Sequence, residues 1–196
     1  MAWATELAVG NVALSLLGEG TITDIDSTTD ARALALSAFF DTARDHVLSL
    51  HDWAFADTLV QLTENTTSDN FSIYDTLYAR PTDMIRLVTL TAGTSDYSDS
   101  PYDPFVLRGA YLATDNDPCW IRYTKQITTV SLWPHWFGLA MAHYLAYLAS
   151  PRITENPKKT AACFQTFGQQ LIEAIRMDAV QRKERTIPPT LITDIG

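Results

Sequence analysis

The sequence predicts an α+β protein that is mainly helical, with a four-helix body, a β-rich antiparallel insertion between helices 2 and 3, and an extended C-terminal arm. Three observations predict this division. Helical apolar patterns occupy both ends of the 196-residue chain, short apolar runs separated by turn-forming clusters fill its middle, and a Pro-Pro pair follows the last helical pattern. We therefore expect one discontinuous helical body over 1–55 and 129–185, the insertion over 56–128 and the arm over 186–196.

The first helix is predicted over 4–17, and Gly18 would end it because glycine readily adopts the left-handed conformation of a helix C-terminus. The second helix is predicted over 29–50, with the Ser27-Thr28-Thr29 cluster as its N-cap and Asp30 in its first turn. Its apolar residues recur at spacings of four and three, which makes a stripe for packing: Leu36, Phe40, Ala43, Val47 and Leu50.

After residue 55 the apolar pattern changes from a helical period to that of short strands. Apolar and β-branched runs alternate with turn-forming clusters at a spacing of about ten residues, which predicts one antiparallel sheet of roughly three to five strands. Gly109 lies between two of the runs and predicts a hairpin. The predicted strands are 58–62, 84–90, 105–107, 111–113 and 120–123.

Two further helices are predicted after the insertion. One begins near Trp133 and ends at Ser150-Pro151, because proline lacks the N–H that a helix interior needs. The next begins at Asn156-Pro157, an N-cap residue followed by proline at the first helical position, and continues to near Glu184. Pro188-Pro189 exclude a helix beyond it, so the arm is predicted to be extended.

Composition narrows the classes of protein. The formal net charge of −9 argues against a protein that wraps duplex DNA, which needs a basic surface. Cys119 and Cys163 have no metal-like spacing and are expected to be reduced and buried, which suits a cytoplasmic origin.

Residues 132–150 carry no Asp, Glu, Lys or Arg, but proline, histidine and tyrosine dilute their apolarity, so we expect a core helix rather than a membrane span. The N-terminus has no basic region before its apolar residues and predicts an amphipathic helix, not a signal peptide.

The histidines do not indicate a metal or catalytic site. His46 and His51 point in different directions on the predicted helix, and His135 and His143 would lie about 12 Å apart along theirs, too far to share one ion. His51 and Asp52 project about 100° apart, and adjacency does not create the geometry of a triad. We interpret the pair as the frayed end of the helix, and we expect no catalytic residue, no metal ligand and no cofactor.

Four carboxylates leave an enzymatic alternative open. A hydrolase of glycosidic bonds needs two carboxylates on either side of the scissile bond. The candidates all lie in turn-rich segments, where such side chains commonly cap the backbone. They are Glu19, Glu64, Asp115 and Asp117.

Five segments, taken in order, resemble one known family. They are "NVALSLLGEGTITDID" at 11–26, "ARDHVLSLHDWAFA" at 43–56, "YARPTDMIRLVTL" at 78–90, "WIRYTKQITTVSLWPHWFGLAMAHYLAYLASPRI" at 120–153 and "AIRMDAVQ" at 174–181. The chain is similar to the head–tail connector, or adaptor, proteins of short-tailed phages, including the group called tail tubular protein A. The similarity covers nearly the whole chain, although residues 91–119 do not align with the family.

The resemblance implies a structural, non-enzymatic virion protein that is made in the host cytoplasm and sits in the neck of the particle. The helical body would form a homo-oligomeric ring of about twelve subunits with cyclic symmetry. That ring would bind the portal protein, extend the DNA channel and receive the tail nozzle, with no membrane contact and no sequence-specific DNA binding. An acidic channel would repel phosphates and let DNA slide. The portal-docking arm would use Ile187, Pro188, Pro189, Leu191, Ile192 and Ile195.

Aromatic residues mark the expected junction between the body and the insertion. Trp53 and Phe55 follow the second helix directly, and we expect them to pack there with Tyr78, Pro81 and Trp133. Two alternatives to the adaptor remain. One is a virion-associated cell-wall or polysaccharide hydrolase, and the other is a bacterial helical scaffold that binds no portal.

Overall fold

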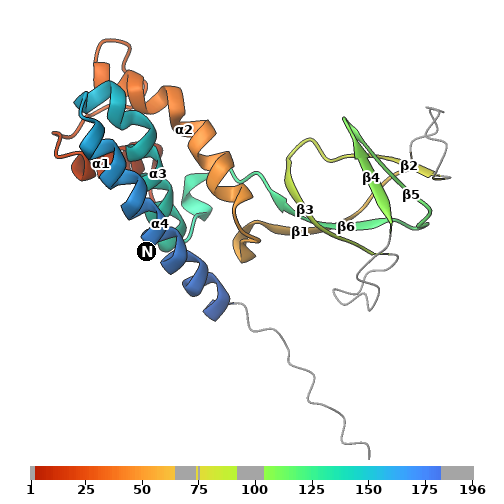
Figure 1. The fold of residues 1–196 in the computed structure, drawn as a ribbon. Coiled ribbons are helices and arrows are strands. Elements are labelled where there is room, and N and C mark those ends of the chain that lie inside the picture. The colour runs from red at the N-terminus through yellow and green to blue at the C-terminus, as the bar shows by residue number, and fades with distance from the viewer. Residues whose placement is uncertain (1–2, 65–73, 75, 92–103, 182–196) are drawn as a thin grey trace, which may run out of the picture.

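The computed structural model describes residues 3–64, 74, 76–91 and 104–181, which form an α+β fold that is mainly helical, as predicted. All the described strands lie between the second and third helices. Figure 1 shows the helices gathered on one side and the strands projecting from the end of α2. The helices are α1 (Glu6–Leu16), α2 (Ala31–Ser49), α3 (His135–Thr154) and α4 (Pro157–Gln181).

Helix α3 is the centre of the helical body, because α1, α2 and α4 all pack against it. Phe137, Met141 and Leu145 of α3 are fully buried, which explains why this stretch carries so few charges. At Gly138 a side chain would collide with the indole of Trp3, whose N–H donates to the carbonyl of His135. No described helix is long and apolar enough to cross a membrane.

The N-cap of α2 differs from the prediction. Asp30 caps the helix, since its carboxylate accepts from the backbone N–H of Arg32 at 2.9 Å, whereas the Ser27 hydroxyl bonds within the preceding loop. A carboxylate is the better partner for the positive end of a helix, which accounts for the choice. The predicted stripe is buried except for Leu50, which follows the last helical residue and is 37% exposed.

The predicted end of α3 at Ser150-Pro151 is wrong, because the helix continues through Pro151 to Thr154. Proline in the last turn removes one hydrogen bond, and the Thr154 hydroxyl donates to the carbonyl of Ser150 at 3.0 Å. Helix α4 begins as predicted, with the Asn156 side chain accepting from the N–H of Lys158 at 3.0 Å. The end predicted near Glu184 lies outside the described residues.

The insertion contains two antiparallel sheets where the sequence predicted one. Sheet order is β1-β6-β3 in the first and β2-β5-β4 in the second, so β4 and β5 are the one paired set of described strands that also follow each other in sequence. Gly109, at φ +57°, makes the predicted hairpin between β4 and β5. The strands are β1 (Asp57–Gln61), β2 (Thr76–Ala79), β3 (Met84–Thr91), β4 (Phe105–Arg108), β5 (Tyr111–Thr114) and β6 (Trp120–Lys125).

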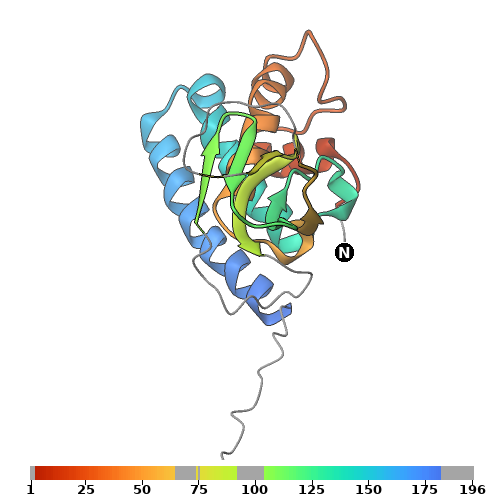
Figure 2. The ribbon, with the colours of Figure 1, turned by 90° about the vertical axis from the view of Figure 1, so that its right-hand side faces the viewer.

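Strand β2 had no counterpart in the sequence prediction. It has only four residues and pairs with β5, which places Tyr78 opposite Leu112 in the core of the insertion. In Figure 2 the sheets lie in front of the helices.

Polar contacts attach the first sheet to the end of α2. Arg86 of β3 forms an ion pair with Asp52 and donates to the carbonyl of Ser49 at 3.4 Å. Gln126, just after β6, donates to the carboxylate of Asp45 at 2.8 Å. The insertion is therefore attached to the body at β3 and at the end of β6.

The insertion should become less stable at alkaline pH. Burial, followed by nearby negative charges, raises the pKa of Tyr78 to about 12, and burial together with its hydrogen bond to Asp83 raises the pKa of Tyr123 to about 12. Both phenols keep their protons more tightly when folded, so their stabilisation is complete below pH 10 and is lost between about pH 10 and 12. Unfolding measured across that range should show a falling free energy, and Tyr123→Phe should flatten the fall. Full ionisation of both phenols near pH 10 in the folded protein would contradict this.

Candidate functional site

Trp53 lies in the core of the helical body, where the chain leaves α2. It is fully buried, its indole donates to the carbonyl of Val47 at 2.9 Å, and its ring stacks on Trp136 at 5.5 Å. Phe55 meets Phe137 edge-on at 4.8 Å, and Trp133 meets the same ring at 5.3 Å. The two connections to the insertion therefore share one aromatic cluster, the junction cluster: Trp53, Phe55, Trp133, Trp136 and Phe137.

Tyr78 and Pro81 do not belong to the junction cluster, contrary to the expectation. Tyr78 is buried in the separate core of the insertion, and its hydroxyl donates to the carbonyl of Asn116 at 2.8 Å. Pro81 lies in the turn before β3, where its carbonyl accepts from Met84 at 3.3 Å. The physical reason is strand pairing, since β2 pairs with β5 in the second sheet and carries Tyr78 away from the body.

The interpretation of His51 as the frayed end of a helix is wrong. Its Nε2 lies 3.2 Å from Oδ2 of Asp178 on α4, a residue with no exposed surface. The other carboxylate oxygen of Asp178 accepts from the N–H of Ala54 at 3.0 Å. Asp52 turns the other way, toward Arg86, so the adjacent pair does not act together.

Sequence reasoning missed Asp178, although a signal for it exists. Phe167, Ala174 and Asp178 all lie on the buried face of α4, so a carboxylate occupies a position where the helical pattern calls for an apolar side chain. A buried charge needs partners, and the partners of Asp178 lie in the segment that follows α2, so this carboxylate joins α4 to that segment.

The four candidate carboxylates do not converge on one cleft. Glu19 follows α1 in the body, while Glu64 and Asp117 both lie near Tyr78 in the insertion, where their charges help raise its pKa. Glu64, Asp115 and Asp117 are exposed. Among the described residues, no group of three or more His, Cys, Asp or Glu side chains could hold a metal ion.

Within the helical body, negative charge is concentrated in the first two helices and their loop. Residues 3–50 carry seven carboxylates against two arginines, a net charge of −5, whereas residues 134–181 carry four basic and three acidic side chains, a net charge of +1. Burial, then the charges of Asp41 and Asp26, raise the pKa of Glu6, and Arg44 partly opposes them. Carboxylates from α1, the loop and α2 thus share one region, which we call the acidic face: Glu6, Asp26 and Asp41.

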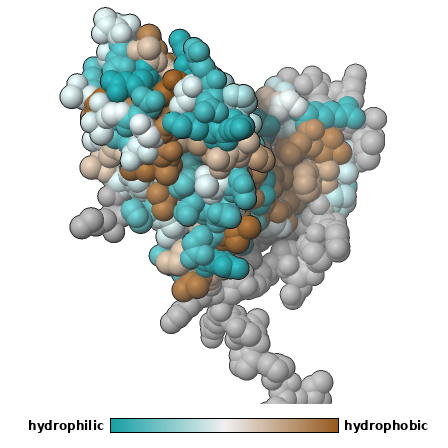
Figure 3. All heavy atoms as spheres, turned by 60° about the vertical axis from the view of Figure 1, so that its left-hand side comes forward, coloured by the Kyte–Doolittle hydropathy of each residue, from teal (hydrophilic) through white to brown (hydrophobic). Residues whose placement is uncertain are grey.

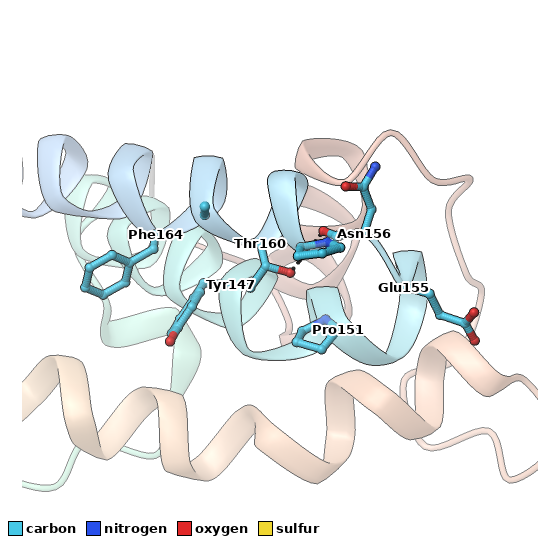
Figure 4. Close-up of a pocket in the computed structure, with 8 residues that line it drawn as sticks. Tyr147, Pro151, Glu155, Asn156, Thr160 and Phe164 are labelled. Carbon is cyan, nitrogen blue, oxygen red and sulfur yellow. Dashed lines mark hydrogen bonds between the residues drawn. The ribbon is translucent and has the colours of Figure 1, made fainter.

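An open groove of about 590 Å³ lies where α3 ends and α4 begins. Figure 4 shows Tyr147 and Pro151 of α3 facing Thr160 and Phe164 of α4 across it. The rings of Tyr147 and Phe164 are 5.0 Å apart, and Phe164 is 57% exposed. We call this the proline–aromatic groove.

Apolar side chains are also exposed along the rest of α4. On the side of the body turned forward in Figure 3, apolar residues lie among polar ones at the surface. These side chains supply apolar surface that a protein partner could bury. Besides Phe164, they are Ile172, Met177 and Val180.

The comparison with known proteins adds no relative. No family model matches the chain, and no curated protein matches it. Inference about what the protein does therefore depends on its own surfaces and on the resemblance.

Proposed function

We propose that the protein is a structural head–tail adaptor of a tailed phage. Copies of the helical body form a ring below the portal, extend the DNA channel and receive the tail nozzle. The observation that carries the proposal is the division of charge within the body, between the acidic face of α1 and α2 and the nearly neutral α3 and α4.

A ring subunit around DNA needs two kinds of surface, and the body offers both. Toward the channel, carboxylates repel phosphates and prevent counterion-driven binding, so DNA passes without adhering. Toward neighbouring proteins, exposed aromatic and aliphatic side chains provide contact area that becomes buried on assembly. The acidic face supplies the first surface, and the exposed residues of α4 supply the second.

The attachment of the insertion also supports an adaptor. An ion pair and hydrogen bonds to the end of α2, together with the junction cluster, fix the insertion to the helical body. If the helical bodies form a ring, their insertions would therefore be arranged at regular positions around it. Such a ring suits docking of the tail nozzle. The arm, whose residues lie outside the described part of the chain, is proposed to reach the portal.

Portal binding by the full chain and by a chain lacking 186–196 tests the arm. The full chain should co-sediment with the portal encoded in the same genome. The shortened chain should keep its circular dichroism spectrum and lose at least tenfold in affinity, because the arm carries a large share of the contact. Equal binding by both chains would contradict the arm's role.

An assay with purified peptidoglycan separates the adaptor from the hydrolase. An adaptor should release no soluble fragments. Degradation that a Glu64→Gln or Asp117→Asn substitution abolishes would instead establish the hydrolase, since both of these candidate carboxylates lie near Tyr78.

A further inference from the structure

We propose that the proline–aromatic groove of one copy binds the Pro188-Pro189 segment of a second copy. This inference goes beyond the proposed function, because it concerns contacts between free subunits and not the portal. It depends on the proposed function only in treating the arm as a binding segment.

The groove has the chemistry of a site for an extended, proline-containing chain. Such segments adopt a polyproline II helix before they bind, and they dock on grooves lined by aromatic rings. Tyr147 and Phe164 supply two rings 5.0 Å apart, and Pro151 and Pro157 supply flat apolar walls beside them. The exposed ring of Phe164 has most of its surface available to a ligand.

The chain's own arm fits this chemistry. The sequence "TIPPTL" at 186–191 places two prolines between apolar side chains. The arm leaves α4 after Gln181, at the opposite end of the helix from the groove. The composition of the arm therefore matches the groove. The position at which the arm leaves α4 decides whether it reaches the groove of the same copy or of a second copy.

The distance from the end of α4 to the groove favours binding of the arm to a second copy over binding to the same copy. Phe164 and Gln181 are seventeen residues apart on α4, or about 25 Å. Pro188 is seven residues beyond Gln181, and seven residues of polyproline II span only about 22 Å, with the chain first having to turn back. Contact with a second copy has no such limit. A groove-to-arm contact joins different surfaces, so it produces rings or open chains instead of closed two-fold dimers.

Sedimentation equilibrium of full-length chains tests the contact. The wild-type chain should associate beyond dimers as its concentration rises to about 1 mM. Phe164→Ala removes the groove ring, and Pro188→Ala with Pro189→Ala removes the ligand, so each variant should associate at least tenfold more weakly. Glu173→Ala, an exposed change on the same helix outside the groove, should associate like the wild type.

Mixing the two deficient variants gives the decisive result. One variant retains an intact arm and the other an intact groove, so the mixture should form 1:1 dimers that do not grow further. A wild-type chain that stays monomeric at about 1 mM, an unaffected Phe164→Ala variant, or a mixture without dimers would each overturn the inference. Association without portal binding would uphold this inference and refute the adaptor, and portal binding without association would do the reverse.

Discussion

Replacing Trp53 with alanine is expected to lower the unfolding free energy by about 3–5 kcal/mol, the range for a large buried aromatic side chain. The ring is fully buried and touches Trp136 and Phe137, so its removal leaves a cavity where both connections to the insertion meet. The indole bond to the carbonyl of Val47 is lost as well. Urea unfolding followed by circular dichroism measures the change.

Two substitutions calibrate that result. Trp53→Phe keeps most of the ring contacts and loses the hydrogen bond, so it should cost about 1–3 kcal/mol. Leu132→Ala, at a side chain that is 62% exposed beside the same cluster, should change stability by less than about 0.5 kcal/mol. A Trp53→Ala protein within 1 kcal/mol of the wild type would show that the junction cluster does not hold the body together.

Replacing Asp178 with alanine is expected to lower the unfolding free energy by about 3 kcal/mol, as expected for hydrogen bonds to a buried charge. The change leaves the N–H of Ala54 without its acceptor and removes the partner of His51 Nε2. The end of α4 should then separate from the segment after α2. Hydrogen exchange at Ala54 and in the last turns of α4 should quicken more than exchange in α1.

The controls for Asp178 use the same helix and the same contact. Asp178→Asn retains an oxygen for the N–H of Ala54 and should cost about half as much as alanine. Glu173→Ala, at an exposed site on α4, should be nearly neutral. His51→Ala should cost about 1 kcal/mol, whereas a frayed helix end would predict no effect. Equal stability of Asp178→Ala and the wild type would contradict the contact.

The helical half of the fold was predictable from the sequence, because each helix carries local signals. Thr5 and Asn156 cap α1 and α4, and the apolar stripes of the helices point to one core. Pro151 misled the prediction, because a proline in the last turn of α3 removes only one hydrogen bond and the helix continues to Thr154.

The sheets and the polar contacts depend on residues far apart in the chain. Spacing alone could not show that β1 and β3 flank β6, or that a four-residue strand carries Tyr78 into a second sheet. Asp178 and His51 are 127 positions apart, and nothing local indicates that they meet.

The mass of the assembled complex tests the adaptor most directly. Native mass spectrometry of the 21.8-kDa chain should be run alone and after mixing with the portal encoded in the same genome. Each portal ring is expected to carry about twelve copies of the chain, with cyclic symmetry. A portal that keeps its own mass at saturating chain concentration would contradict it.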